Sequence, residues 1–185
     1  MSTLLSPAEA QQLPTVLVLA SGLGLRFIAS GGVGHKLQAD LLGRTVLQRS
    51  LDAVRTSGLL FHLEDAGHPG MGDTIAAAVR ATRGAAGWLV LPADLPLIHA
   101  ETLMALAQAP STASVLIPVF EGQRGHPVRF APACGDALAA LQGPRGAASV
   151  VAQWDRQEWP VTDAGCVTDI DSLADLLRAR AMLQA

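Results

Sequence analysis

An almost uniformly apolar run, Thr15–Leu19, leads directly into a segment that contains five glycines and ends at Leu37. A strand that is apolar at nearly every position is covered on both faces, which is typical of a parallel sheet with helices on each side. Glycine loses the most conformational freedom on folding, so a loop this rich in it needs a reason. The usual reason is a close approach of the backbone to a ligand. The run and its loop therefore predict a buried parallel strand whose carboxyl end meets a ligand.

Strand and helix patterns alternate along the rest of the chain. The strand candidates are residues 59–63, 88–91, 114–120, 159–161 and 166–170; the helix candidates are residues 46–56, with Gly58 as their stop, 73–82, with Asp73 or Thr74 as the cap, 100–108, 136–141, 147–154 and a last helix capped by Ser172. This alternation predicts a three-layer α/β/α sandwich around a mostly parallel, Rossmann-like sheet. Residues 1–14 are expected to form a loosely held N-terminal tail, and residues 15–185 a single domain.

Composition excludes several classes of protein. Half of the residues are hydrophobic and 16% are charged, which excludes a disordered chain. The net charge is −3 and no basic tract stands out, so we expect no nucleic acid as a partner. No apolar stretch approaches the ~20 residues that a membrane-spanning helix needs, and we expect no membrane partner. Cys134 and Cys166 lie far apart, which is typical of reduced cysteines in a cytoplasmic protein.

Two common phosphate-binding patterns do not fit the glycine loop. A dinucleotide fingerprint would use Gly22 and Gly24, but its third glycine position is occupied by Phe27. A Walker loop needs a lysine directly after its last glycine, whereas His35 separates Gly34 from Lys36. The glycine loop therefore matches neither pattern.

Six segments, in order, resemble the nucleotidyltransferases of the molybdenum cofactor type, and most closely the cytidylyltransferase branch. They are "LASGLGLRF…HKL", "GMGDTIAAAVRA", "LPADLPLI", "GQRGHPVRF", "GPRGAASV" and "VTDIDSLADL". The resemblance implies a fold of the nucleotide-diphospho-sugar transferase type. The chain departs from the family pattern in two places. The stretch between Arg26 and Lys36 is longer than usual. The stretch between Gly58 and Gly70 is shorter, which predicts a sheet that is smaller by one strand–helix unit.

The resemblance also implies a reaction. A nucleoside monophosphate, CMP from CTP in the first place, would move to a phosphorylated acceptor, molybdopterin in the first place, with Mg²⁺ as cofactor and pyrophosphate as product. A guanylyltransferase and a sugar-phosphate or polyol-phosphate nucleotidyltransferase are the alternatives within this fold. A non-catalytic nucleotide- or cofactor-binding partner of a molybdoenzyme is the alternative from another class.

Such a reaction is limited by repulsion between an anionic nucleophile and an anionic triphosphate, so it needs positive charge and positioning more than a general base. The expected catalytic residues are Lys36 and Arg26, which would supply positive charge, and Asp94. Asp94 and Asp171 would hold Mg²⁺, with Asp169 as the competitor of Asp171. Asp94 could instead cap a turn before Pro96, and Asp171 could cap the last helix.

The remaining assignments follow the matched segments. The expected nucleotide-binding residues are Leu19, Ala20, Ser21, Gly22, Gly24, Gly72, Asp73 and Thr74. The expected acceptor-binding residues are His126, Arg129 and Arg145. His126 could instead be a turn histidine fixed by Pro127, and Arg145 a surface residue.

Overall fold

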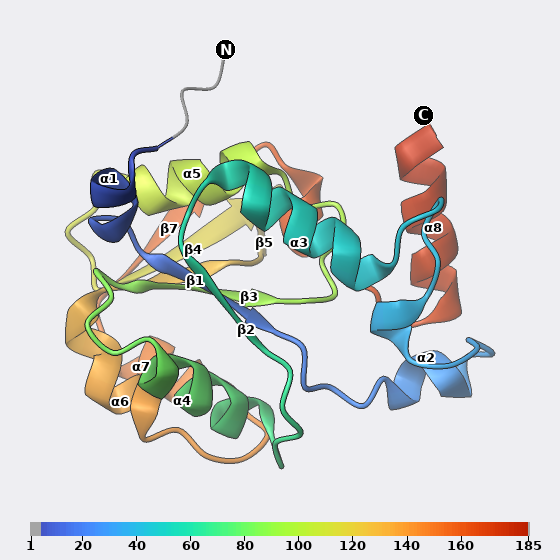
Figure 1. The fold of residues 1–185 in the computed structure, drawn as a ribbon, viewed down its shortest axis with the longest axis horizontal. Coiled ribbons are helices and arrows are strands. Elements are labelled where there is room, and N and C mark those ends of the chain that lie inside the picture. The colour runs from blue at the N-terminus through green and yellow to red at the C-terminus, as the bar shows by residue number, and fades with distance from the viewer. Residues whose placement is uncertain (1–4, 185) are drawn as a thin grey trace.

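The computed structural model describes residues 5–184. Seven strands form one sheet, in the order β2-β1-β3-β6-β4-β5, with β7 also paired to β4 (Figure 1). The strands are β1 Thr15–Leu19, β2 Phe61–Glu64, β3 Trp88–Pro92, β4 Val115–Phe120, β5 Gln123–Arg124, β6 Val128–Phe130 and β7 Arg156–Pro160. Five of them run in the same direction, and β5 and β6 run against them. The mostly parallel sheet that the sequence predicts is confirmed.

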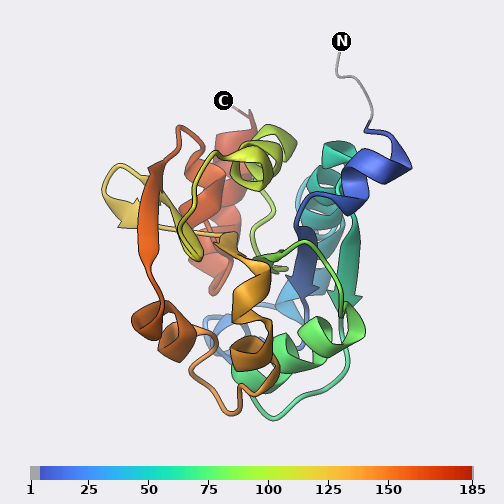
Figure 2. The same ribbon diagram turned by 90° about the vertical axis from the view of Figure 1, so that its left-hand side faces the viewer.

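Helices cover both faces of this sheet. The helices are α1 Pro7–Gln11, α2 Leu25–Ala29, α3 Val46–Ser57, α4 Met71–Ala81, α5 Ala100–Gln108, α6 Gly135–Ala139, α7 Ala148–Gln153 and α8 Leu173–Gln184. Figure 1 shows α1, α3 and α5 over one face and α4, α6 and α7 over the other, and Figure 2 shows the sheet between these two layers. Short 3₁₀ helices lie at Lys36–Gln38, Pro132–Cys134 and Ala164–Val167.

Strand alternation divides the core into two clusters. Val16 and Val18 of β1 point into the cluster under α3 and α5, while Leu17 and Leu19 point into the cluster under α4, α6 and α7. All five residues of β1 are buried, as expected for a strand covered on both faces. The apolar run Thr15–Leu19 therefore forms an internal strand that helices cover on both faces.

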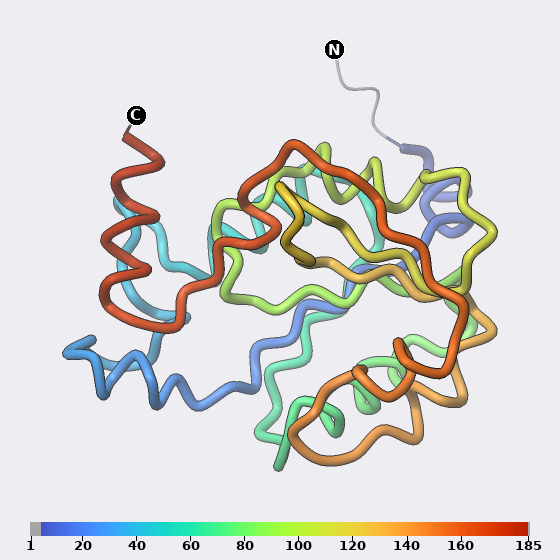
Figure 3. The backbone as a smooth tube through the Cα atoms, turned by 180° about the vertical axis from the view of Figure 1, so that it is seen from behind, coloured from blue at the N-terminus to red at the C-terminus, as the bar shows by residue number. Residues whose placement is uncertain are grey.

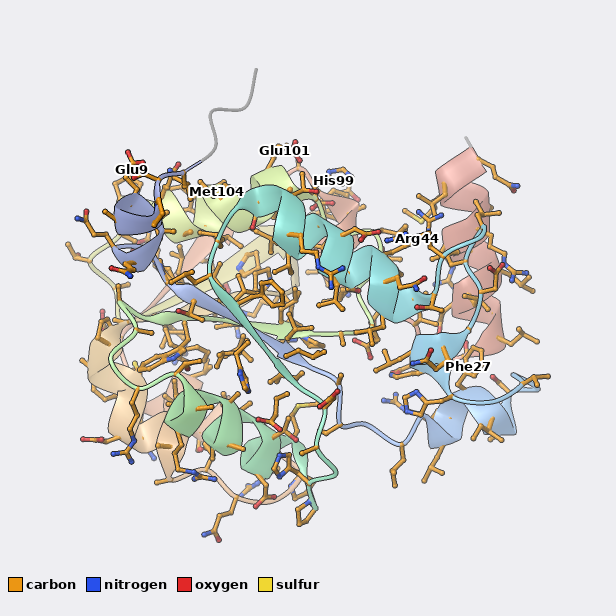
Figure 4. All side chains as sticks on the ribbon, in the orientation of Figure 1. Glu9, Phe27, Arg44, His99, Glu101 and Met104 are labelled. Carbon is orange, nitrogen blue, oxygen red and sulfur yellow. The ribbon has the colours of Figure 1, made fainter. Side chains whose placement is uncertain are left out.

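One end of the molecule is built differently. α2 and α8 lie together there, away from the two helix layers, and Figure 3 shows α8 from behind beside the loop that follows α2. Phe27, labelled in Figure 4, anchors α2 because its ring is buried. Gly32 packs so closely on that ring that an added Cβ would lie 2.2 Å from it. Leu173 at the start of α8 donates its N–H to the Ser30 hydroxyl, at 2.9 Å.

Three expectations about local structure were wrong. Residues 7–11, placed in a loose tail, form α1, which a capping box between Ser6 and Glu9 starts. α4 begins at Met71 with Gly70 as its cap, and not at the expected Asp73 or Thr74. The Asp73 carboxylate accepts the Gly143 N–H and does not cap the helix. Residues 166–170, expected to be a strand, are a 3₁₀ turn and coil.

The expected strand at 166–170 fails for a local reason. Asp163 accepts the N–H of Gly165 and starts the 3₁₀ turn Ala164–Val167. Gly165 also lies against the backbone of Leu97, where an added Cβ would lie 2.1 Å from the carbonyl oxygen. The chain turns there and does not extend beside the sheet. Between Gly58 and Gly70 the chain forms one strand, β2, which is an edge of the sheet.

Candidate active site

A cleft of about 730 Å³ opens where β1 and β3 end. The glycine loop and α2 form one wall, and the turn around β5, from Gln123 to His126, contributes another. The segment between the 3₁₀ turn at residues 164–167 and α8 supplies Asp169 and Asp171. This is the edge of an open α/β sheet at which ligands bind, and eight of the expected site residues line it.

Of the glycine loop, Leu19, Gly22 and Gly24 line this cleft. Gly24 has a φ of +65°, in the left-handed region that favours glycine, and it starts α2. Gly22 has nothing within 4 Å of the position where a Cβ would lie, so its backbone is open toward the cleft. This leaves room beside Gly22, where the sequence predicts a phosphate.

His35 holds the glycine loop in place, a role that sequence reasoning missed. Its Nδ1 accepts the Leu37 N–H at 3.2 Å, which leaves Nε2 as the donor to the Gly22 carbonyl at 2.6 Å. The ring therefore joins the loop to the segment that carries Lys36. The sequence shows His35 between Gly34 and Lys36, but there it served only as the reason to reject the Walker pattern.

Lys36 lies at the centre of the site. Its Nζ donates to Asp94 Oδ2 at 2.6 Å and to Asp171 Oδ1 at 2.7 Å. Arg26, from α2, contacts the other Asp171 oxygen at 2.6 Å. The lysine side chain is 12% exposed, and the Arg26 side chain 81% exposed, so the first is enclosed and the second faces solvent. The long stretch between Arg26 and Lys36 thus leaves Lys36 inside the cleft.

The two carboxylates converge from different elements. Asp94 follows β3, and its backbone carbonyl accepts the Ile170 N–H at 2.9 Å, which ties the Asp171 segment to the end of β3. Asp171 does not cap α8 with its side chain. The Asp175 carboxylate accepts the backbone N–H groups of both Asp171 and Ser172, and it also accepts the Ser172 hydroxyl. The Asp171 carboxylate is therefore free to face Lys36.

Charge is concentrated in this cluster. Burial by itself would lower the pKa of Lys36, but the carboxylates of Asp94 and Asp171 outweigh it and raise that pKa. Asp169 also lines the cleft, and its pKa is raised by burial and by the nearby charges of Asp171 and Asp94. Lys36 carries its positive charge at neutral pH. It stabilises the neighbouring carboxylates of Asp94, Asp169 and Asp171, which would otherwise repel one another.

The cluster fits a divalent cation. Asp94 Oδ1 is buried and has no hydrogen-bond partner among the described residues, so this oxygen has an unused lone pair inside the site. Within residues 5–184, no group of three or more His, Cys, Asp and Glu side chains has the arrangement of a metal site. Mg²⁺, however, usually takes only one or two carboxylates and completes its shell with waters and substrate phosphates. Asp94 and Asp171 are a donor set of that kind.

The other expected nucleotide-binding residues make their contacts within the protein. Asp73 accepts the Gly143 N–H at 2.9 Å, and Thr74 is fully buried and donates its hydroxyl to the Gly70 carbonyl at 3.0 Å. Ser21 hydrogen-bonds to Thr74. Gly72 donates its N–H to the Gly143 carbonyl at 2.8 Å. Neither these four residues nor Ala20 line the cleft, where Met71 represents the start of α4.

The three expected acceptor residues separate in space. His126 lines the cleft, and Arg145 is exposed at a second cavity beside it. Arg129 lies elsewhere, so its assignment was wrong. Its guanidinium donates to the carbonyls of Leu106, Ala109 and Ser111, at and just beyond the carboxyl end of α5. In β6 the side chains alternate, and Arg129 points to the face opposite that of its neighbours Val128 and Phe130.

Sequence reasoning also missed Gln123 and Arg124. Both line the cleft, on the turn that precedes His126. The Arg124 Nε donates to Glu158 on β7 at 2.7 Å, which orients this arginine. Arg124 lies in an exposed two-residue strand, which has no recognisable pattern in the sequence, and only the folded sheet places this residue opposite α2.

None of the described helices is long and apolar enough to cross a membrane.

Comparison with solved structures gives the fold. The chain is similar to a nucleotidyl transferase from Methanothermobacter, with a TM-score of 0.76 and 18% identity, covering 93% of this chain and 98% of that one. It is similar to Rv0371c of Mycobacterium tuberculosis in complex with manganese, with a TM-score of 0.71 and 19% identity, covering 91% and 98%. It is also similar to molybdopterin-guanine dinucleotide biosynthesis protein A of Archaeoglobus fulgidus, with a TM-score of 0.68 and 21% identity, covering 92% and 98%.

Comparison of sequences gives the family. A search of curated proteins found no match. The family model of the MobA-like NTP transferase domain matches residues 56–158, more than half of the 185-residue chain. The matched region contains β3, Asp94 and the turn with His126. The chain therefore belongs to the family of MobA-like NTP transferase domains and is a nucleotidyltransferase.

Proposed function

We propose that this nucleotidyltransferase moves CMP from CTP to the phosphate of a phosphomonoester acceptor, with Mg²⁺ as cofactor and pyrophosphate as the leaving group. An acceptor phosphate oxygen forms a bond to the α-phosphorus of CTP, and the bond from that phosphorus to the bridging oxygen of the β-phosphate breaks. The acceptor phosphate is largely dianionic at neutral pH, because its second pKa is about 6. No protein base is needed, and the chain's task is to hold and neutralise anions.

The observation that carries this proposal is the contact of Lys36 with both Asp94 and Asp171 beside an open glycine backbone. The backbone of Gly22 and Gly24 would receive the triphosphate. Arg26 would neutralise phosphate charge with its planar fork, and Lys36 would neutralise the charge that develops as pyrophosphate leaves. Asp94 and Asp171 would hold Mg²⁺, which when bound neutralises phosphate charge.

The finer assignments rest on different supports. CTP rests on the resemblance of "GMGDT" and "GHPV" to the cytidylyltransferase branch. GTP is the competing nucleotide, because one similar structure is named as a molybdopterin-guanine dinucleotide biosynthesis protein. Molybdopterin as the acceptor rests on the same resemblance and on that name. We place the reaction in the cytoplasm, in keeping with two buried free cysteines.

The test is turnover with each of the four α-labelled NTPs, Mg²⁺ and a panel of phosphomonoesters that includes molybdopterin. We expect pyrophosphate release and label transfer to be fastest with CTP. Lys36→Ala should abolish most of the turnover, while Arg83→Ala, a change to an exposed cation that does not line the cleft, should not affect it. Binding of NTP and acceptor without any label transfer would favour the non-catalytic partner of a molybdoenzyme.

A further inference from the structure

A second cavity, of about 420 Å³, lies between the sheet and the helices α4 and α7. β6 forms its floor with Val128 and Phe130, and α7 forms part of its roof with Ala148 and Val151. Of the residues that line it within the described part of the chain, His126 and Arg145 alone carry polar side chains. A cavity of this size, apolar with a few polar groups, has the character of a small-molecule pocket.

This cavity is continuous with the reaction cleft. Leu19, Met71, Pro92 and His126 line both. His126 stands at the boundary, and its Nδ1 is buried without a hydrogen-bond partner among the described residues. A buried acceptor atom that is left unpaired costs free energy, so this nitrogen is suited to receive an N–H or O–H from a ligand.

The loop that closes the cavity is held rigidly. Gly143 exchanges two hydrogen bonds with the start of α4, its N–H to the Asp73 carboxylate and its carbonyl from the Gly72 N–H. Gly70 lies so close to this loop that an added Cβ would be 2.4 Å from the Gly143 backbone. Gly72 and Asp73 thus position the wall of the second cavity, although they do not line the cleft.

The geometry of attack at the phosphorus indicates how the cleft and the second cavity would be used together. In phosphoryl transfer, the attacking and leaving oxygens lie roughly in line on opposite sides of the phosphorus. The triphosphate is assigned to the glycine loop and Arg26, on one wall of the cleft. The attacking phosphate must then come from the side of Gln123, Arg124 and His126, behind which the second cavity opens.

We propose that the second cavity takes the body of the acceptor, and that this body is a largely apolar group with one N–H or O–H that donates to His126 Nδ1. The acceptor phosphate lies in the cleft, and Arg145 lies at the rim of the cavity. This inference rests on the proposed function and narrows its acceptor, away from a body as rich in polar ring atoms as the pterin of molybdopterin. Sugar phosphates and polyol phosphates are polar on all sides, and they would leave hydroxyl groups unpaired against Val128, Phe130 and Val151.

The test compares two probe phosphates, 1-naphthyl phosphate and glycerol 3-phosphate, by isothermal titration into the full chain with CTP and Mg²⁺ present. We expect 1-naphthyl phosphate to bind at least about tenfold more tightly than glycerol 3-phosphate. Ala148→Leu, which fills the cavity from α7, should weaken naphthyl phosphate binding about tenfold. Ala152→Leu is the matched control, since Ala152 is exposed on the same helix and does not line the cavity.

A second variant, Val151→Phe, repeats the test from another position if Ala148→Leu is poorly folded. Equal binding of the two phosphates, or naphthyl phosphate binding that Ala148→Leu and Val151→Phe leave unchanged, would overturn the inference. CTP binding should be the same in all variants. CMP transfer to whichever acceptor the phosphomonoester panel identifies, continuing at the normal KM in Ala148→Leu, would overturn the inference while leaving the proposed function intact.

Discussion

The Nζ atom of Lys36 lies 2.6 Å from Oδ2 of Asp94, across 58 residues of sequence, in a site that is largely closed to solvent. The same ammonium group holds Asp171 at 2.7 Å. Lys36 therefore stands between the two carboxylates as their shared cation. It can neutralise these carboxylates or a phosphate group of the substrate, and a divalent cation that binds Asp94 and Asp171 would compete with it for the same oxygens.

Removal of this ammonium group should improve metal binding. In Lys36→Met the Asp94 carboxylate loses its cation in a partly buried site and Asp171 keeps only the exposed Arg26, so the pair attracts a divalent cation more strongly. We expect Mn²⁺, measured by electron paramagnetic resonance without nucleotide, to bind Lys36→Met about tenfold more tightly than the wild type. Arg83→Met serves as the control for loss of one positive charge. Equal or weaker Mn²⁺ binding by Lys36→Met would show that the lysine does not compete for this position.

Two glycines at the site have different tasks and should respond differently to alanine. Gly70→Ala forces a methyl group against the Gly143 backbone, 2.4 Å away, and we expect it to destabilise the fold by about 1–3 kcal/mol. Gly22→Ala meets nothing within 4 Å, so stability should be unchanged while NTP affinity falls. Thermal unfolding and NTP titration separate the two effects. A stable Gly70→Ala protein, or normal NTP binding by Gly22→Ala, would refute the respective assignment.

Arg129 should matter for stability and not for catalysis. Arg129→Met keeps much of the apolar stem but removes the donors to the three carbonyls beyond α5. We expect a loss of about 1–3 kcal/mol, which for a chain of this size lowers the Tm by about 2–4 °C per kcal/mol. The kcat and KM of the folded variant should equal those of the wild type. A raised acceptor KM would restore the sequence-based assignment of Arg129 to the acceptor.

His126 should make stability depend on pH. Burial lowers the pKa of His126, although the Val90 backbone and the carboxylates of Asp94 and Asp169 oppose that shift. Below the unfolded pKa of about 6.5 the unfolded chain binds a proton that the folded histidine does not, so stability falls as the pH decreases. We expect the Tm to drop between pH 7.5 and pH 5.5, and His126→Gln to reduce that drop. Parallel curves for the two proteins would argue against this origin.

The sequence predicts those parts of the fold whose signals are local. The apolar run Thr15–Leu19 becomes the buried central strand, and Gly58 ends α3 with a φ of +73°. Residues 166–170 carry β-branched side chains typical of a strand, but the tight contact of Gly165 with Leu97 turns the chain, a contact between distant segments that no local pattern contains.

The site residues likewise separate into those that local sequence patterns predict and those that contacts between distant segments place. The sequence places Lys36 in the loop after β1 and Asp94 after β3, at the same sheet edge. It brings Asp171 there at the end of a strand that does not form, and the bond from the Ile170 N–H to the Asp94 carbonyl holds Asp171 in place instead. The face toward which Arg129 points depends on how the short strand β6 is paired with β3 and β4, so its position between matched residues was misleading. His35 and Asp73 act through backbone partners 13 and 70 residues away, and such partners have no side-chain signature.

The central claim is that Asp94, with Asp171, holds the cation that joins the nucleotide to the enzyme. The most direct measurement is isothermal titration of CTP into the wild type and Asp94→Asn, each with and without Mg²⁺. We predict that Mg²⁺ tightens CTP binding to the wild type by about tenfold or more, and that Asp94→Asn removes most of this gain while it keeps the metal-free affinity. The same gain from Mg²⁺ in both proteins would contradict the account.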